Sequence, residues 1–317
     1  MDCHIGALRF EGCKLLPHAL APHSRRMARE QPPTGPSDNA AKISEPIAHR
    51  QEDASGREIW FESGGVRLFA VEHGRGSPVV FLHGGLADHR AALRHLGALA
   101  ATHRLITPDL RGAGRSHFAG ELSWDRWADD VAELLSHLGV ERAVVGGVSM
   151  GSAVAVRFAL RHPERLSALV LMSPLYPGDE RPLAEAASGA MRVMAEAGER
   201  AVQEGMDALR PLFDALPPSL REGALKMLQS FDPVSVAATT RFLATGVQPL
   251  RTARELAAIA VPVMVLPGID PQHPADVGAL YVRHLRHPVV AEQTAPNLLE
   301  RVAAFCANPQ AADPVIR

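Results

Sequence analysis

Apolar residues along this 317-residue chain recur in short runs, separated by stretches in which apolar positions return every three or four residues. Two segments of alternating character join at a Gly-Gly turn, which is typical of a β-hairpin. Longer apolar runs of the kind found in buried parallel strands follow them. The expected strands cover residues 58–63, 66–74, 78–84, 103–109, 143–149, 166–174, 261–268 and 288–292.

Helical spacing fills the intervals between these runs at about 88–100, 124–138 and 151–162. The second interval is the best formed, because Ser123 stands at its start as a helix cap and its apolar residues form one stripe. Strands that alternate with helices predict an α/β fold. We expect a mostly parallel sheet with an antiparallel hairpin at one edge and helices on both faces.

The alternation stops between residues 175 and 260, where several helices and no strand are expected. Methionine and phenylalanine at helical spacing in this segment favour packed core over substrate contacts. An insertion after the sixth strand, at the carboxyl edge of a parallel sheet, would cover the crevice in which ligands bind. We therefore expect a helical lid over 175–260 and an α/β core made of 57–174 and 261–310.

Residues 1–56 lack any hydrophobic periodicity and mix Pro, Ser, His and charged residues. This composition is typical of a disordered N-terminal extension, with a regulatory arm as the functional alternative. Met27 is an alternative start within it. Charged residues occupy the positions where a secretory signal needs an apolar core, so the segment is a poor signal peptide.

The overall composition argues against several classes of partner. A hydrophobic content of 46% and a charged content of 21% suit a packed globular protein. The net charge of −2 provides no attraction to nucleic acid or to an anionic membrane. No apolar run approaches the roughly 20 residues that span a bilayer. We expect a protein with a small-molecule substrate; the oligomeric state is left open.

The cysteines and glycines exclude the common cofactor motifs. Cys3, Cys13 and Cys306 are too widely spaced for a disulfide framework or a metal site, which fits a reducing compartment. No phosphate-binding glycine loop is present, and histidine and cysteine do not cluster. We expect a cytoplasmic protein without a cofactor and without a metal.

The stretch "GGVSMGS" at 146–152 carries the strongest chemical signal. Ser149 stands between Gly147 and Gly151, at the end of an expected strand and the start of an expected helix. This G-x-S-x-G arrangement lifts a serine hydroxyl above the sheet and points a helix N-terminus at any anion formed there. A Gly-Ser turn without chemistry is the alternative, but the strand before it and the helix after it favour a nucleophile.

A second glycine pair ends the strand at 78–84, in "FLHGG". The backbone N–H groups of Gly85 and Met150 would form a two-donor oxyanion hole beside Ser149. His83 precedes this pair, so we interpret it as a structural residue that braces the loop.

The motifs "FLHGG", "DLRGAGRS" and "GGVSMG" resemble those of the α/β-hydrolase fold family in order and in spacing, from about residue 58 to 306. The resemblance implies that Asp109, Arg111 and Gly114 shape a structural turn outside the chemistry. Many relatives carry histidine immediately before the nucleophile, where this chain has Val148. The commonest lipase-like variant is therefore not indicated.

The resemblance also implies a carboxylate after a late strand. Asp270 follows the expected strand at 261–268 and matches that position. Asp179, after the strand that ends at 174, is the alternative acid, since some relatives place it there. An ordinary turn aspartate is the remaining interpretation of Asp270.

The catalytic histidine of the family follows the last strand, and in this chain no histidine occurs after His287. The usual position is therefore empty. We rank His273 first as the base, because it lies three residues after Asp270 in a loop expected at the catalytic edge. A site without any histidine base comes second. His287 lies at the wrong end of its strand, and His284 falls within a helix as a surface residue.

The sequence thus favours an esterase- or lactonase-like serine hydrolase acting on a small carboxylic ester, thioester or lactone. Ser149, Asp270 and His273 would be catalytic, and Gly85 and Met150 would form the oxyanion hole. One alternative keeps the fold with another reaction, as a perhydrolase, a lyase or a C–C bond hydrolase. The other is a non-catalytic ligand-binding protein with an incomplete triad.

Overall fold

The computed structural model describes residues 56–311, except 119, 215 and 217, and leaves the side chain of residue 219 undescribed. The expected N-terminal extension, residues 1–56, lies outside the described residues apart from Gly56. Its disorder stays a prediction.

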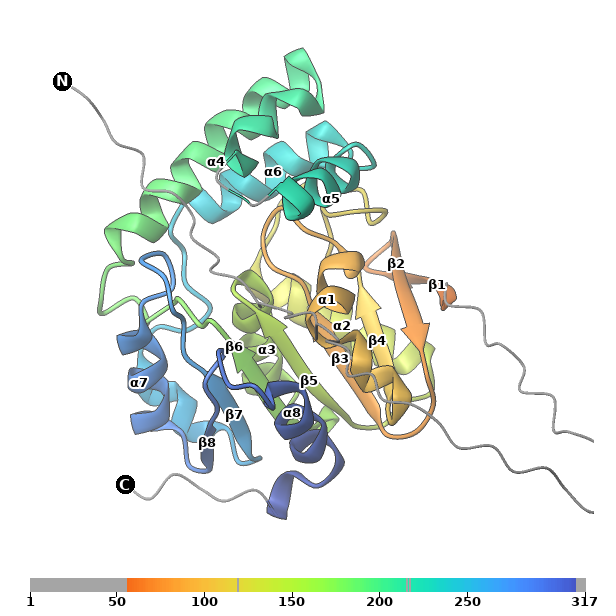
Figure 1. Cartoon of the computed structure of the whole chain (residues 1–317), viewed down its shortest axis with the longest axis vertical. Coiled ribbons are helices and arrows are strands. Elements are labelled where there is room, and N and C mark those ends of the chain that lie inside the picture. Colours follow the sequence, from red (N-terminus) through yellow and green to blue (C-terminus); the bar gives the residue numbers. More distant parts are fainter. Residues whose placement is uncertain (1–55, 119, 215, 217, 312–317) are drawn as a thin grey trace, which may run out of the picture. The chain divides into compact units, whose positions relative to one another are not determined.

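An eight-stranded sheet organises the described residues, in the order β1-β2-β4-β3-β5-β6-β7-β8 (Figure 1). The strands β1 and β2 pair antiparallel at one edge, β2 pairs antiparallel with β4, and the remaining pairs are parallel. The predicted mostly parallel sheet with an edge hairpin is confirmed. The strands are Arg57–Ser63 (β1), Val66–His73 (β2), Pro78–Leu82 (β3), Arg104–Pro108 (β4), Ala143–Val148 (β5), Leu166–Met172 (β6), Val263–Leu266 (β7) and Pro288–Val290 (β8).

Burial along the strands explains their sequence patterns. The central strand β5 is buried at every residue except Val148, and β7 is buried throughout, as expected of parallel strands covered on both faces. The edge strand β1 instead mixes buried and exposed positions. Alternate residues of β3 enter two different cores: Val80 and Leu82 join one, whereas Val79 and Phe81 join the other.

Helices cover both faces of the sheet, as predicted. The core that contains Val80 and Leu82 also contains buried residues of three helices, α2 (Trp124–His137), α3 (Met150–Arg161) and α7 (Ala275–His284). The opposite core contains residues of α1 (His89–Leu96) and α8 (Leu298–Ala307). Ser123 caps α2 by accepting a hydrogen bond from the Arg126 N–H at 3.1 Å.

The first helix is shorter than the sequence predicted. The α-helical part of 88–100 ends at Leu96, and a 3₁₀ helix, η1 (Gly97–Ala101), continues it. Asp88 caps α1 through a 2.9 Å hydrogen bond from the Arg90 N–H. The short helix follows the loop after β3, which contains Gly85, one of the two residues expected to form the oxyanion hole.

The described residues between β6 and β7 form helices, as the sequence predicted, and Figure 1 shows α4 (Glu185–Glu204), α5 (Pro218–Leu228) and α6 (Pro233–Ala244) gathered at one end of the sheet. They have a small apolar core of their own, against which Leu86 and Ala87 of the loop after β3 pack. That this segment is a lid stays a prediction. Its elements are α4 (Glu185–Glu204), η3 (Met206–Phe213), α5 (Pro218–Leu228), α6 (Pro233–Ala244) and η4 (Ala253–Ala258).

Candidate active site

Ser149 occupies a strained turn between β5 and α3. Its backbone angles are φ 53° and ψ −114°, a region that residues with a side chain rarely adopt. The Ser149 N–H donates to the Met172 carbonyl at 3.0 Å, which extends the β5–β6 ladder up to the turn. Because the strand ends here and the helix begins at Met150, the turn holds the hydroxyl at the carboxyl edge of the sheet.

Two glycines make this turn sterically feasible. A Cβ atom on Gly147 would stand 2.4 Å from the carbonyl carbon of Gly151. A Cβ atom on Gly151 would stand 2.4 Å from the Leu82 carbonyl oxygen. Helix α3 therefore passes so close to β5 and β3 that neither position has room for a side chain. The G-x-S-x-G spacing follows from this packing.

Asp270 and His273 share one tight turn immediately after β7. Asp270 Oδ1 accepts hydrogen bonds from the N–H groups of Gln272 at 2.9 Å and of His273 at 3.0 Å. The His273 N–H also lies 3.1 Å from the Asp270 carbonyl oxygen. The Asp270 side chain thus stabilises the turn through these hydrogen bonds and fixes the backbone position of His273.

The imidazole of His273 joins this carboxylate to the serine. His273 Nδ1 lies 3.0 Å from Asp270 Oδ1 and 3.1 Å from Oδ2, and Nε2 lies 2.8 Å from Ser149 Oγ. A carboxylate only accepts hydrogen bonds, so Nδ1 carries a proton. In the neutral ring, Nε2 is then free of a proton and accepts from the serine hydroxyl. His273 is only 8% exposed, which shields these hydrogen bonds from water.

The carboxyl of Asp270 is held in its ionised form. Burial raises its pKa, but the hydrogen bond and charge of His273 lower it, together with the N–H groups of His273 and Gln272. The balance places the pKa of Asp270 below its ordinary value. A carboxylate that stays ionised can stabilise the positive charge of an imidazolium beside it.

The structure brings together Ser149, Asp270 and His273 and leaves the other candidates elsewhere. Asp179 is exposed, and it is Asp270 that holds His273. His287 is exposed just before β8, and its carbonyl accepts from the Val263 N–H at the amino end of β7. His284 is half-buried at the end of α7, rather than fully exposed.

The loop after β3 passes beside the nucleophile, as expected of an oxyanion loop. A Cβ atom on Gly84 would stand 3.7 Å from Ser149 Cβ and 3.5 Å from the Val148 carbonyl oxygen. Gly85 follows, and Met150 provides the first N–H of α3. The sequence did not point to Ser152, whose hydroxyl donates to the Ser149 carbonyl at 2.7 Å and closes the first turn of α3.

His83 has the contacts of a brace. Its ring is 1% exposed, with Nδ1 2.7 Å from the Gly84 carbonyl oxygen and Nε2 3.0 Å from the Leu110 nitrogen. Nδ1–H therefore donates to Gly84, and Nε2 accepts from the Leu110 N–H, which requires the neutral ring. Burial lowers the pKa of His83, against the raising effect of the Asp109 charge. The ring ties the loop after β3 to the loop after β4.

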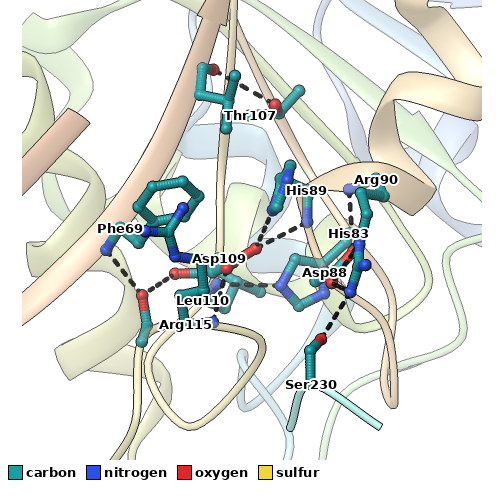
Figure 2. Close-up of polar contacts among 12 residues, drawn as sticks. Phe69, His83, Asp88, His89, Arg90, Thr107, Asp109, Leu110, Arg115 and Ser230 are labelled. Carbon is teal, nitrogen blue, oxygen red and sulfur yellow. Dashed lines mark hydrogen bonds and ion pairs between the residues drawn. The ribbon is translucent and has the colours of Figure 1, made fainter. Parts of the chain in front are cut away.

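A second buried polar cluster surrounds Asp109 (Figure 2). Asp109 Oδ1 accepts from the N–H and from Nδ1 of His89 at 2.8 and 2.7 Å, and Oδ2 accepts from the Arg115 N–H at 2.8 Å. Asp88, His89 and Asp109 together place three potential metal-ligand atoms within 4.8 Å of one another. Asp88, however, uses both carboxylate oxygens on Arg90. The carboxylate oxygens of this cluster therefore accept hydrogen bonds from protein groups, and the bonds from His89 connect the start of α1 with the loop after β4.

Comparison with known proteins agrees with this architecture. Residues 77–210 match the alpha/beta hydrolase fold family. A thermophilic esterase from Thermogutta terrifontis superimposes with a TM-score of 0.61 at 27% sequence identity, over 78% of this chain and 96% of that chain. The resemblance to the α/β-hydrolase fold family that the three motifs indicated is confirmed, and the described residues have the α/β-hydrolase fold.

Curated relatives match over shorter stretches. A 2-hydroxymuconate semialdehyde hydrolase from Pseudomonas sp. strain CF600 is 34% identical over 37% of this chain and 42% of its own length. A Streptomyces coelicolor protein named "Probable proline iminopeptidase" is 31% identical over 60% of this chain and 57% of its own length. The chain thus spans about half the length of these relatives. Among the described residues, no helix has both the length and the apolar character to cross a membrane.

Proposed function

We propose that this protein is a serine hydrolase that cleaves a small carboxylic ester, thioester or lactone. One observation carries the proposal: a continuous hydrogen-bonded chain from Ser149 Oγ through the His273 ring to the Asp270 carboxylate. The three side chains have the roles of nucleophile, base and orienting acid. Gly85 and Met150 provide the oxyanion hole through their backbone N–H groups.

The chemistry proceeds in two displacements. His273 Nε2 takes the hydroxyl proton as Ser149 Oγ attacks the substrate carbonyl carbon, and the carbonyl oxygen becomes an oxyanion held by the two N–H groups. The imidazolium then gives its proton to the leaving oxygen or sulfur, whose bond to the acyl carbon breaks. Water, deprotonated by the same histidine, then attacks the acyl carbon. The bond between that carbon and Ser149 Oγ breaks, the imidazolium returns its proton to Oγ, and the carboxylic acid is released.

Nonpolar surroundings support a neutral acyl group as substrate. Leu243 of α6 approaches the oxyanion loop: its Cδ1 lies 3.4 Å from where a Cβ on Gly85 would stand. Leu243 and Met150 belong to the same buried apolar core. In this proposal the helical segment 175–260 is the lid that covers the acyl side of the site. The cytoplasmic location is retained as a prediction.

Carbon–carbon bond hydrolysis is a second candidate. A relative that is 34% identical over 122 residues is a 2-hydroxymuconate semialdehyde hydrolase. The same serine and histidine can serve that chemistry, in which the leaving group is a carbon atom. Turnover of a 2-hydroxymuconate semialdehyde with little hydrolysis of p-nitrophenyl acetate would favour this candidate over the esterase. Perhydrolase and lyase reactions remain alternatives for the same fold.

A fluorophosphonate probe tests the proposal directly, because it reacts covalently with activated serines. We expect labelling of the wild-type protein at Ser149, and no labelling or p-nitrophenyl acetate hydrolysis in Ser149→Ala. Ser77→Ala, which changes an exposed serine away from the turn, serves as the matched control and should be labelled normally. An unlabelled wild-type protein would instead support the non-catalytic ligand-binding alternative.

A further inference from the structure

The side chain of Gln293, in the loop after β8, reaches across the end of β7. Its Nε2 donates to the Pro267 carbonyl at 2.7 Å and to Ser173 Oγ at 2.8 Å, and the Leu266 carbonyl lies at 3.4 Å. Pro267 begins the loop after β7, and Ser173 directly follows β6. A single amide group thus connects the loops that leave three neighbouring strands at the carboxyl edge of the sheet.

The contact with Pro267 bears on the position of His273. The next residue, Gly268, packs directly on the histidine backbone: a Cβ there would stand 1.9 Å from the His273 carbonyl oxygen and 2.5 Å from its Cβ. The two ends of the turn are therefore in close contact. Because Gly268 and His273 are in close contact, a displacement of Pro267 and Gly268 would also displace His273.

The contact with Ser173 connects the same amide to the nucleophile. Ser173 lies at φ 51°, in the left-handed region, and its N–H donates to the Leu266 carbonyl at 2.9 Å. The residue before it, Met172, accepts the 3.0 Å hydrogen bond from the Ser149 N–H. Gln293 therefore spans the gap between the strand that holds Ser149 in place and the turn that carries His273.

We propose that Gln293 is a positioning residue that sets the distance between His273 Nε2 and Ser149 Oγ. The inference rests on the proposed function, since it assigns Gln293 to the same site. The amide acts by donating: both principal partners are oxygen atoms, and its two N–H bonds fix the start of the turn relative to β6. Gln293 does not touch the reacting atoms, so its effect passes through His273.

Substitution of the amide tests this role. Gln293→Ala removes both hydrogen bonds, and a misplacement of about 1 Å between nucleophile and base can cost on the order of 10²-fold in rate. We expect kcat for p-nitrophenyl acetate to fall roughly 10- to 100-fold, with KM changed less than about threefold. The rate of covalent inactivation by a fluorophosphonate should fall in proportion. Thr294→Ala, at the exposed next position, is the control and should retain wild-type values.

Gln293→Glu separates hydrogen-bond donation from side-chain size. The two side chains have nearly the same shape, but an ionised carboxylate has no proton to donate to the Pro267 carbonyl. We therefore expect Gln293→Glu at pH 7 to lose as much kcat as Gln293→Ala. Wild-type kcat in either variant would overturn the inference. So would a loss confined to KM, or one explained by partial unfolding in a thermal melt.

The outcomes also distinguish this inference from the proposed function. If Ser149→Ala and His273→Ala lose activity while both Gln293 variants keep it, the hydrolase proposal stands and the role of Gln293 is wrong. If Ser149→Ala keeps full activity, the hydrolase proposal itself fails, and with it the role of Gln293.

Discussion

His273 Nε2 lies 2.8 Å from Ser149 Oγ, although 124 residues separate the two in the sequence. The same ring contacts Asp270, only three residues before it. In the proposed enzyme, the base and the acid therefore belong to the same turn. Catalysis then depends on the position of this one loop relative to Ser149. This arrangement differs from the one that the motifs implied, in which the base follows the last strand.

The pairing of His273 with Ser149 predicts that the two residues act as a unit. His273→Ala should reduce kcat for p-nitrophenyl acetate about as much as Ser149→Ala, on the order of 10⁴-fold or more. The double variant should be no slower than either single variant, because each already disables the same step. Steady-state kinetics on all three proteins provide the test.

The other late histidines serve as matched controls for that experiment. His284→Ala and His287→Ala should leave kcat within about twofold, since neither side chain is among the contacts of Ser149 or Asp270. Near-normal turnover by His273→Ala, or a large loss in either control, would contradict the assignment of the base.

The charge of Asp270 should matter more for rate than for folding. In Asp270→Asn, the side-chain oxygen can still accept from the Gln272 and His273 N–H groups, so the turn is retained. The imidazolium formed during catalysis loses its carboxylate partner, and we expect kcat to fall about 10³–10⁴-fold. The melting temperature should stay close to that of the wild type. Asp270→Ala, which also removes the acceptor, should lower both.

The elements that the sequence predicted well are those whose signals are local. The apolar run 143–149 and the helix after it predict the nucleophile turn. A strand that is buried on both faces has an unbroken apolar sequence, so its end is easy to recognise. The glycines beside Ser149 are required by backbone contacts within the same turn. The ends of the elements were less well placed: η1 replaces the last turn of the first expected helix.

Contacts between segments that are distant in the sequence could not be predicted from it. The order of His273, His284 and His287 does not reveal which ring reaches Ser149, because that depends on how β7 and its loop sit against β5. The three-residue spacing of Asp270 and His273 was the available hint. Nothing in the loop after β8 marked Gln293, whose partners lie 26 and 120 residues away.

The cluster around Asp109 should give the fold a measurable sensitivity to acid. Burial raises the pKa of Asp109, but the hydrogen bond and charge of His89 and the N–H groups of Arg115 and His89 lower it below its ordinary value. The ionised carboxyl therefore stabilises the folded state above the unfolded pKa of about 3.9, and the contribution is lost as the pH falls through the lowered pKa.

Urea unfolding of Asp109→Asn measures that contribution. The variant should be less stable than the wild type by about 1–3 kcal/mol at pH 7, because a buried charged acceptor is replaced. The difference between the two proteins should shrink as the pH is lowered below 4. Asp179→Asn, at an exposed position, should change the free energy of unfolding by less than about 0.5 kcal/mol. A difference independent of pH would contradict this account.

Leu243 should limit the size of the acyl group in the proposed enzyme. Helix α6, which carries it, is fastened to the core, since Thr239 Oγ1 donates to the Gly112 carbonyl at 3.1 Å and Ser235 Oγ accepts from the Phe118 N–H at 2.8 Å. Truncation of Leu243 should therefore leave a space beside Gly85 instead of a collapsed helix. That space would accommodate additional methylene groups of a substrate.

We expect Leu243→Ala to raise the ratio of kcat/KM for p-nitrophenyl hexanoate to that for p-nitrophenyl acetate by about tenfold, the low end of what a methylene contact contributes. The variant should lose about 2–5 kcal/mol of stability, as buried leucines do on truncation. Leu134→Ala, in the middle of α2, is the matched control, with a similar loss of stability and an unchanged ratio. If both variants raise the ratio equally, a general loss of packing in the protein explains the effect. If neither variant raises it, Leu243 does not face the acyl group.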